Sequence, residues 1–261
     1  AVPQLQVLQF KAPDRFRYRV SFDFVGEMLT YLPNLQELKV EGEMATHKSH
    51  TGAALANGLA KTPLLERLEL NTNTFCLETL DLPHLPHLHT ITIKGRYSEP
   101  KSAIEQFMKR LATLPALVNL SVNGLAMENL SLLSQHMPTQ LQHLRVWLEN
   151  DREITPDEEL ALQTEFIKSV MRVPHLESLR IHTMDWKCSS TFVDFVQVWP
   201  DRPFTRLPLS INLPEVWPTV LAVLPKCTQI TSLTLPSDES APIVDFLKAM
   251  PHLQTLMIDN L

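Results

Sequence analysis

The chain has 261 residues, of which 44% are hydrophobic and 20% charged, and its formal net charge is −6. This length allows a large core within a single domain, and the mildly acidic balance argues against a general nucleic-acid or membrane-surface binder. No run of 18 apolar residues occurs, so the sequence offers no transmembrane helix. The three cysteines are far apart and form no Cys-x-x-Cys pair, which predicts a reduced, cytoplasmic protein.

One phrase of the form Pro-x-Leu-x-x-Leu-x-Val recurs along the chain. Eight copies read PQLQVLQF (3–10), PNLQELKV (33–40), PLLERLEL (63–70), PHLHTITI (86–93), PALVNLSV (115–122), PTQLQHLRV (138–146), PHLESLRI (174–181) and PHLQTLMI (251–258). CTQITSLTL (227–235) keeps the apolar spacing without the proline, and FTRLPLSI (204–211) is the one candidate for a tenth copy. The first apolar positions are separated by 30, 30, 23, 29, 24, 35, 28, 26 and 23 residues. We therefore predict ten copies of one structural unit.

Each phrase predicts a short strand, because its last two apolar positions alternate as they do on a strand with one buried face. The stretch before each strand has helical spacing. In residues 101–115, Ile104, Phe107 and Leu111 share one helical face. Residues 155–174 begin with a threonine N-cap, a proline at the first helical position and acids in the first turn. Each predicted helix ends at a proline, which cannot continue it.

Neither the strand nor the helix of one unit can bury its apolar side alone, so neighbouring units must share a core. We therefore predict an α/β solenoid over residues 1–261, a curved arc of about ten irregular repeats. Parallel strands are expected on its concave face and helices on its convex face. The chain begins and ends inside a repeat phrase without a polar cap, which predicts that it is part of a longer protein.

At these residues the sequence resembles the leucine-rich-repeat superfamily, in particular the long-repeat, helix-containing branch typified by ribonuclease inhibitor and F-box-associated repeat proteins. The segment GAALANGLAKTPLLERLELNTN (52–73) carries the likeness best, with Asn73 in the slot where the family places a ladder asparagine. The resemblance covers the whole chain and implies an architecture, not a function. Irregular turns are expected because other copies fill the slot with Arg96, Leu125, Glu149, Met184 or Asp238.

The phrase at the predicted eighth strand, FTRLPLSI (204–211), departs most from the other copies. Pro208 lacks a backbone N–H, so we expect the sheet to be distorted there. Two alignments remain open: one counts the phrase from Phe204, and the other makes Leu209 and Ile211 the inward pair.

Residues that flank the inward positions should line the concave face. On copies six to eight they are basic and surround a tryptophan, and Arg and Trp are the residue types that dominate binding energy at protein interfaces. We therefore predict a partner-binding site made of His143, Arg145, Trp147, Arg180, His182 and Arg206. The alternative is that Trp147 folds down over the strand end and the arginines are simply solvated.

Two other motifs have competing interpretations. The acidic stretch ENDREITPDEE (149–159) is either a protruding recognition loop or the start of a helix, where acids are favoured. The three histidines of HLPHLHT (84–90) suggest a metal, but His87 occupies the same repeat slot as His175 and His252. Because no carboxylate or cysteine at ligand spacing completes a site, we predict neither a metal nor a cofactor.

No nucleophile elbow, phosphate loop, zinc-protease motif or dinucleotide motif occurs in the sequence. We therefore predict that the protein is not an enzyme but a scaffold that binds a protein or peptide in its concave face, and neither nucleic acid nor membrane. The resemblance leaves two alternatives. One is the substrate-recognition domain of an F-box-type ubiquitin ligase or an effector protein, whose adaptor would bind outside this chain. The other is a GTPase-activator-like regulator.

Overall fold

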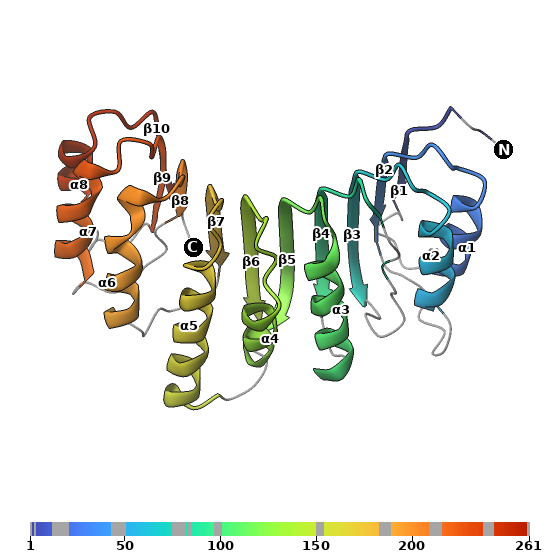
Figure 1. Cartoon of the computed structure of the whole chain (residues 1–261), viewed down its shortest axis with the longest axis horizontal. Coiled ribbons are helices and arrows are strands. Elements are labelled where there is room, and N and C mark those ends of the chain that lie inside the picture. The colour runs from blue at the N-terminus through green and yellow to red at the C-terminus, as the bar shows by residue number, and fades with distance from the viewer. Residues whose placement is uncertain are drawn as a thin grey trace.

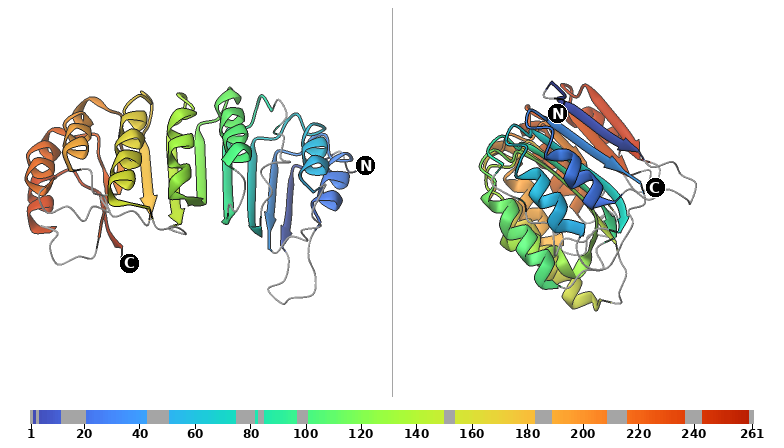
Figure 2. Two further views of the ribbon diagram at one scale, coloured as in Figure 1. Left: turned by 90° about the horizontal axis from the view of Figure 1, so that it is seen from below. Right: turned by 90° about the vertical axis from the view of Figure 1, so that its right-hand side faces the viewer.

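The described strands form one open parallel sheet of ten strands, β1 to β10, arranged in chain order (Figure 1). The computed structural model describes residues 2, 4–11, 21–42, 51–74, 82, 85–96, 101–149, 154–182, 189–208, 216–236 and 243–259. The described helices form a single layer on one face of the sheet, as the end-on view shows (Figure 2). The predicted α/β architecture with parallel strands is therefore confirmed.

Strands and helices alternate along most of the chain. The strands are β1 Val7–Lys11, β2 Glu37–Glu41, β3 Arg67–Thr74, β4 Thr90–Arg96, β5 Asn119–Ala126, β6 His143–Glu149, β7 Ser178–His182, β8 Arg206–Pro208, β9 Ser232–Pro236 and β10 Thr255–Asp259. The helices are α1 Phe22–Leu29, α2 Thr51–Leu59, α3 Lys101–Thr113, α4 Leu130–Gln135, α5 Pro156–Val170, α6 Ser189–Gln197, α7 Trp217–Val223 and α8 Ile243–Ala249. Short 3₁₀ turns occupy Met127–Asn129, Trp199–Asp201 and Leu224–Lys226.

A repeated hydrogen-bond arrangement joins each strand to the next. The carbonyl of Gln6, just before β1, accepts from the backbone N–H groups of Gln36 (2.7 Å) and Glu37 (2.9 Å). Within the described residues, a single backbone carbonyl likewise accepts from two successive N–H groups of the next repeat at Gln36, Glu66, His89, Val118, Gln142, Glu177, Thr205 and Thr231. These acceptors are spaced as the first apolar positions of the phrases are, so each phrase corresponds to one structural unit.

The prolines of the phrase lie inside tight turns. Leu35 N donates to the carbonyl of Leu32 at 3.2 Å, and Pro33 is the second residue of this four-residue turn. Equivalent bonds enclose Pro63, Pro86, Pro115 and Pro251. The fixed φ of proline, near −65°, suits this turn position. The proline therefore both ends the helix, as predicted, and shapes the entry into the strand.

The core lies between the sheet and the helix layer. The alternating apolar residues of the strands face it, and Leu38 and Val40 of β2 are 1% and 0% exposed. Ile104 and Phe107 of α3 contribute the helical side and are equally buried. This match between strand and helix faces confirms that neither layer buries its apolar side without the other.

The predicted start of α5 is present in detail. The Thr155 hydroxyl accepts from Glu158 N at 3.3 Å, and the Glu158 carboxylate accepts from Thr155 N at 3.1 Å, which completes a capping box. Pro156 occupies the first helical position. The hydrogen bonds from Thr155 lower the pKa of Glu158. The acids of residues 157–159 thus begin a helix, while residues 150–153 lie outside the described part of the chain.

The predicted distortion at the eighth strand is also present. In the described residues β8 pairs with β7 only at Arg206 and Ser178, whereas it pairs with β9 at three positions. Arg206 N donates to the carbonyl of Glu177 at 3.3 Å, and the next donor toward β7 would be the N–H that Pro208 lacks. Toward β9 the carbonyl of Thr205 accepts from Thr231 N at 3.1 Å and from Ser232 N at 3.2 Å, and neither bond involves the missing N–H of Pro208.

The alignment counted from Phe204 holds. Leu207 pairs with Leu233 of β9, and Phe204 is 2% exposed, with its ring 5.8 Å from that of Phe195. This pairing favours the alignment counted from Phe204, whereas Leu209 and Ile211, the inward pair of the alternative, lie outside the described residues.

Among the described residues, none of the helices has the length and apolarity needed to cross a bilayer.

The reactivity of the Cys227 thiol can test whether the core near the last two repeats is closed to solvent. Its side chain is 0% exposed, Sγ donates to the carbonyl of Val223 at 3.5 Å, and burial raises the thiol pKa from 9.0 to about 11. Because the folded state holds the thiol more protonated than the unfolded state does, its stabilising contribution is complete below pH 9 and is lost as the pH rises toward 11. We expect the native thiol to resist a disulfide reagent at pH 8 and to react after addition of denaturant. Rapid native labelling of a Cys76→Ser/Cys188→Ser variant would contradict this.

Candidate functional site

The sheet face opposite the helix layer, here called the open face, presents one outward side chain at every second strand position. On β2 to β4 these side chains neutralise one another. Lys39 Nζ lies 2.8 Å from Glu41 and 3.4 Å from Glu69, and Lys94 Nζ lies 4.0 Å from Glu69. The hydrogen bond between Lys39 and Glu41 raises the pKa of the lysine and lowers that of the glutamate. This end of the open face therefore carries little uncompensated charge.

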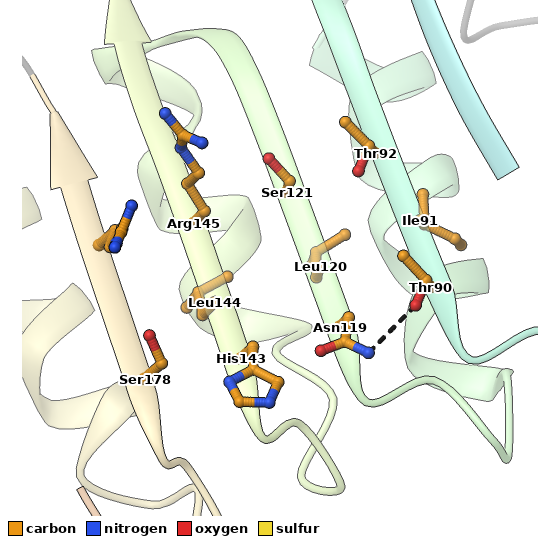
Figure 3. Close-up of a pocket in the computed structure, with 11 residues that line it drawn as sticks. Thr90, Ile91, Thr92, Asn119, Leu120, Ser121, His143, Leu144, Arg145 and Ser178 are labelled. Carbon is orange, nitrogen blue, oxygen red and sulfur yellow. Dashed lines mark hydrogen bonds between the residues drawn. The ribbon is translucent and has the colours of Figure 1, made fainter. Parts of the chain in front are cut away.

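The middle of the open face is neutral and polar. Asn119 Nδ2 on β5 donates to Thr90 Oγ1 on β4 at 3.0 Å, as the dashed line in Figure 3 shows. His89 Nδ1 lies 2.9 Å from the same hydroxyl. Thr92 and Ser121 are the next outward residues of these two strands. Their short side chains leave room between the bulkier residues on either side.

The predicted site residues come together on β6 to β8. The sheet register pairs His143 with Ser178, which in turn pairs with Arg206. The next outward position pairs Arg145 of β6 with Arg180 of β7. We call His143, Arg145, Trp147, Arg180, His182 and Arg206 the basic patch.

Trp147 and His182 pair at the third outward position of the patch. Trp147 keeps 42% of its surface exposed, in agreement with its predicted outward orientation. Only the backbone of His182 is described. The sequence thus identified residues that the sheet places side by side, although they come from three separate repeats.

A hollow of about 130 Å³ lies beside the two arginines. It is lined by Thr90, Ile91, Thr92, Asn119, Leu120, Ser121, His143, Leu144, Arg145, Ser178 and Arg180. In Figure 3 the polar side chains of β4, β5 and β6 stand on the same face of the sheet. Thr92, Asn119 and Ser121 line this hollow, but the site predicted from the sequence did not include them. The sequence could have indicated them, because these small polar residues occupy outward positions on the strands next to the basic strands.

Arg145 and Arg180 have no acidic partner in the part of the chain that the structure describes. Among the described residues no ion pair involves either arginine, and Arg145 Nε is buried without a hydrogen-bond acceptor. Within the described strands β4 to β9, Glu149 at the end of β6 is the one acidic residue. A buried N–H donor without an acceptor costs free energy. Within the described residues, the positive charge of these two arginines is therefore not compensated by an ion pair.

Two residues in the histidine slot of the repeat, His252 and Gln140, contact backbone carbonyls of the preceding repeat. His252 Nε2 lies 3.0 Å from the carbonyl of Cys227 in the preceding turn, and Gln140 in the equivalent slot donates to the carbonyl of Leu114 at 2.7 Å. His87 is exposed in its turn, and His84 lies outside the described residues. No group of three or more His, Cys, Asp or Glu side chains suited to a metal occurs in the part of the chain that the structure covers.

Comparison with known proteins gives a fold likeness and nothing finer. No family model matches the sequence, and no curated protein matches it. A crystal structure of a Bacteroides fragilis protein, determined by a structural genomics consortium, is similar with a TM-score of 0.50 and 15% sequence identity. The likeness covers 98% of this chain and 66% of that one, so this chain spans about two thirds of the length of the protein it matches. Together with the parallel sheet, this similarity shows a repeat-like α/β fold.

Proposed function

We propose that this chain is a leucine-rich-repeat solenoid and that its open face is the concave face of the arc. Support comes from the hydrogen-bonded unit that recurs at the spacing of the phrase and from strands that follow one another in chain order. All described helices lie on one side, which leaves the opposite side of the sheet for binding (Figure 2).

We propose further that the protein is a non-catalytic scaffold that binds a protein or peptide through the basic patch. One observation carries this proposal: Arg145 and Arg180 are paired on neighbouring strands, have no acidic partner among the described residues, and lie next to a half-exposed tryptophan. Arg and Trp are enriched among the residues that contribute most to binding. A partner segment that carries negative charge complements the patch.

The proposal predicts that replacing both Trp147 and Arg180 by alanine weakens partner binding by more than about 1 kcal/mol, because interface hot spots have effects of at least this size. The partner is first captured from native lysate with the unaltered chain. Its dissociation constant is then measured against the variant by isothermal titration calorimetry.

A matched control replaces an exposed aromatic residue and an exposed arginine away from the open face, Tyr31 and Arg172. Tyr31→Ala/Arg172→Ala should bind as the unaltered chain does. An unchanged affinity of the Trp147→Ala/Arg180→Ala variant, or an equal loss in both variants, would rule out the basic patch as the binding site.

A further inference from the structure

We propose that the hollow between β4 and β7 is a subsite for a phosphoryl group, presented on a phosphorylated serine or threonine of the bound partner segment. This inference rests on the proposed function, because it names the chemistry by which the basic patch recognises its partner.

The two arginines are placed to hold one anion together. Arg145 and Arg180 are register partners on adjacent parallel strands, and both line the hollow. Paired positions of neighbouring strands lie about 5 Å apart. A guanidinium offers a rigid fork of N–H donors that matches a phosphate bidentately. One phosphoryl group can therefore be bound by both side chains at once.

The charge balance favours a dianion over a carboxylate. A single carboxylate would compensate one of the two arginines, whereas a phosphomonoester carries a charge of about −1.5 to −2 at pH 7 and three acceptor oxygens. Among the described residues the buried Nε of Arg145 has no acceptor, so the protein's own hydrogen bonds do not use all the donors of this guanidinium. Within the described strands the nearest competing acid along β6 is Glu149, four residues beyond Arg145.

The remaining lining fits the size and polarity of this group. Ser121 and Ser178 add hydroxyls, and His143 adds a ring nitrogen at the rim. The Asn119 amide is already engaged with Thr90 and fixes the edge of the hollow. The hollow of about 130 Å³ is well above the roughly 10–15 Å³ that a single water needs on this measure, so it has room for a group of several heavy atoms such as a phosphoryl group.

The test needs no knowledge of the partner. The 261-residue chain is labelled with ¹⁵N, and the arginine Nε–Hε signals are followed while O-phosphoserine, inorganic phosphate, glutamate or serine is added. We expect phosphoserine to shift the Arg145 and Arg180 signals saturably and to bind at least as tightly as inorganic phosphate. Glutamate should bind about tenfold more weakly or not at all, because it offers one charge and two acceptors.

Arg145→Gln/Arg180→Gln should reduce phosphoserine affinity by about tenfold or more, since hydrogen bonds to charged groups are the strong ones. Arg67→Gln is the matched control, because Arg67 is exposed on the same face in β3 and does not line the hollow. It should leave the affinity unchanged.

Four results would overturn the proposal: no saturable shift with phosphoserine, equal binding of glutamate, tighter binding of free phosphate than of phosphoserine, or equal losses in the two variants. If phosphoserine fails to bind while Trp147→Ala/Arg180→Ala still weakens partner binding, the phosphoryl subsite is wrong and the scaffold function stands. If phosphoserine binds as expected but Trp147→Ala/Arg180→Ala leaves partner affinity unchanged, the subsite exists and the proposed function fails.

Discussion

Leu144→Ala is expected to lower the free energy of unfolding by about 2–5 kcal/mol, the range for a leucine truncated in a packed core. Leu144 is 1% exposed, pairs with Leu120 and Leu179 on the two adjoining strands, and lies under the hollow. Truncation removes apolar contacts and leaves a cavity that the sheet cannot close, because both neighbouring strands are held by their own hydrogen bonds.

The loss should be measured by urea unfolding of the whole chain and by amide hydrogen exchange in β6. Exchange is included because repeat proteins unfold through local units, so the weakened repeat is expected to open first. Leu64→Ala is the matched control: Leu64 is 39% exposed in a turn, and the same truncation there should change stability by no more than about 0.5 kcal/mol. Equal effects of the two substitutions would mean that Leu144 is not a core residue.

Gly124→Ala is expected to destabilise the protein by about 2 kcal/mol or more, although it adds a single methyl group. Gly124 has φ of +91°, a backbone conformation that side chains with a Cβ rarely adopt. A Cβ built there would lie 2.0 Å from the carbonyl oxygen of Gly95 on the neighbouring strand β4. That atom is backbone, so the clash can be relieved only by moving the sheet.

The position of Gly124 links this loss to the candidate site. The register between β5 and β6 shifts between Asn123 and Leu125, and Asn123 is the partner of Trp147. We therefore expect Gly124→Ala to alter the near-ultraviolet circular dichroism of the tryptophans as well as the melting temperature. Ser121→Ala, an outward position earlier in the same strand, should change the melting temperature little. A Gly124→Ala protein as stable as the parent would show that this bulge is not required by the fold.

Most of the fold could be predicted from the sequence, because the pattern of apolar residues that specifies it is local and recurs in every repeat. An apolar pair such as Leu68 and Leu70 alternates in every phrase, and the helix before it has its own apolar stripe. A local pattern repeated ten times predicts the same unit each time, and parallel stacking is the arrangement that buries all the copies together. Even the disruption at Pro208 was predictable, since it depends only on a missing backbone donor.

The candidate site could be predicted from the sequence only in part. The outward positions of Arg145 and Arg180 follow from the alternation of the strand, and their proximity follows from aligning the phrases. The absence of an ion-pair partner for either arginine among the described residues was not deducible, and neither was the buried Nε of Arg145. Those facts depend on rotamers and on neighbours from other strands.

By itself, the sequence determined which residues face the core, how often the unit returns, and that basic residues and a tryptophan gather on the outward side of copies six to eight. The tertiary structure decided what the alternation of apolar and polar residues cannot encode: the neutralised charges on β2 to β4, the bulge at Gly124, and the hollow beside two arginines that form no ion pair within the described residues. The reason is physical. Burial follows from short-range periodicity along the chain, whereas charge compensation and empty volume are set by side chains that meet across strands more than twenty residues apart in sequence.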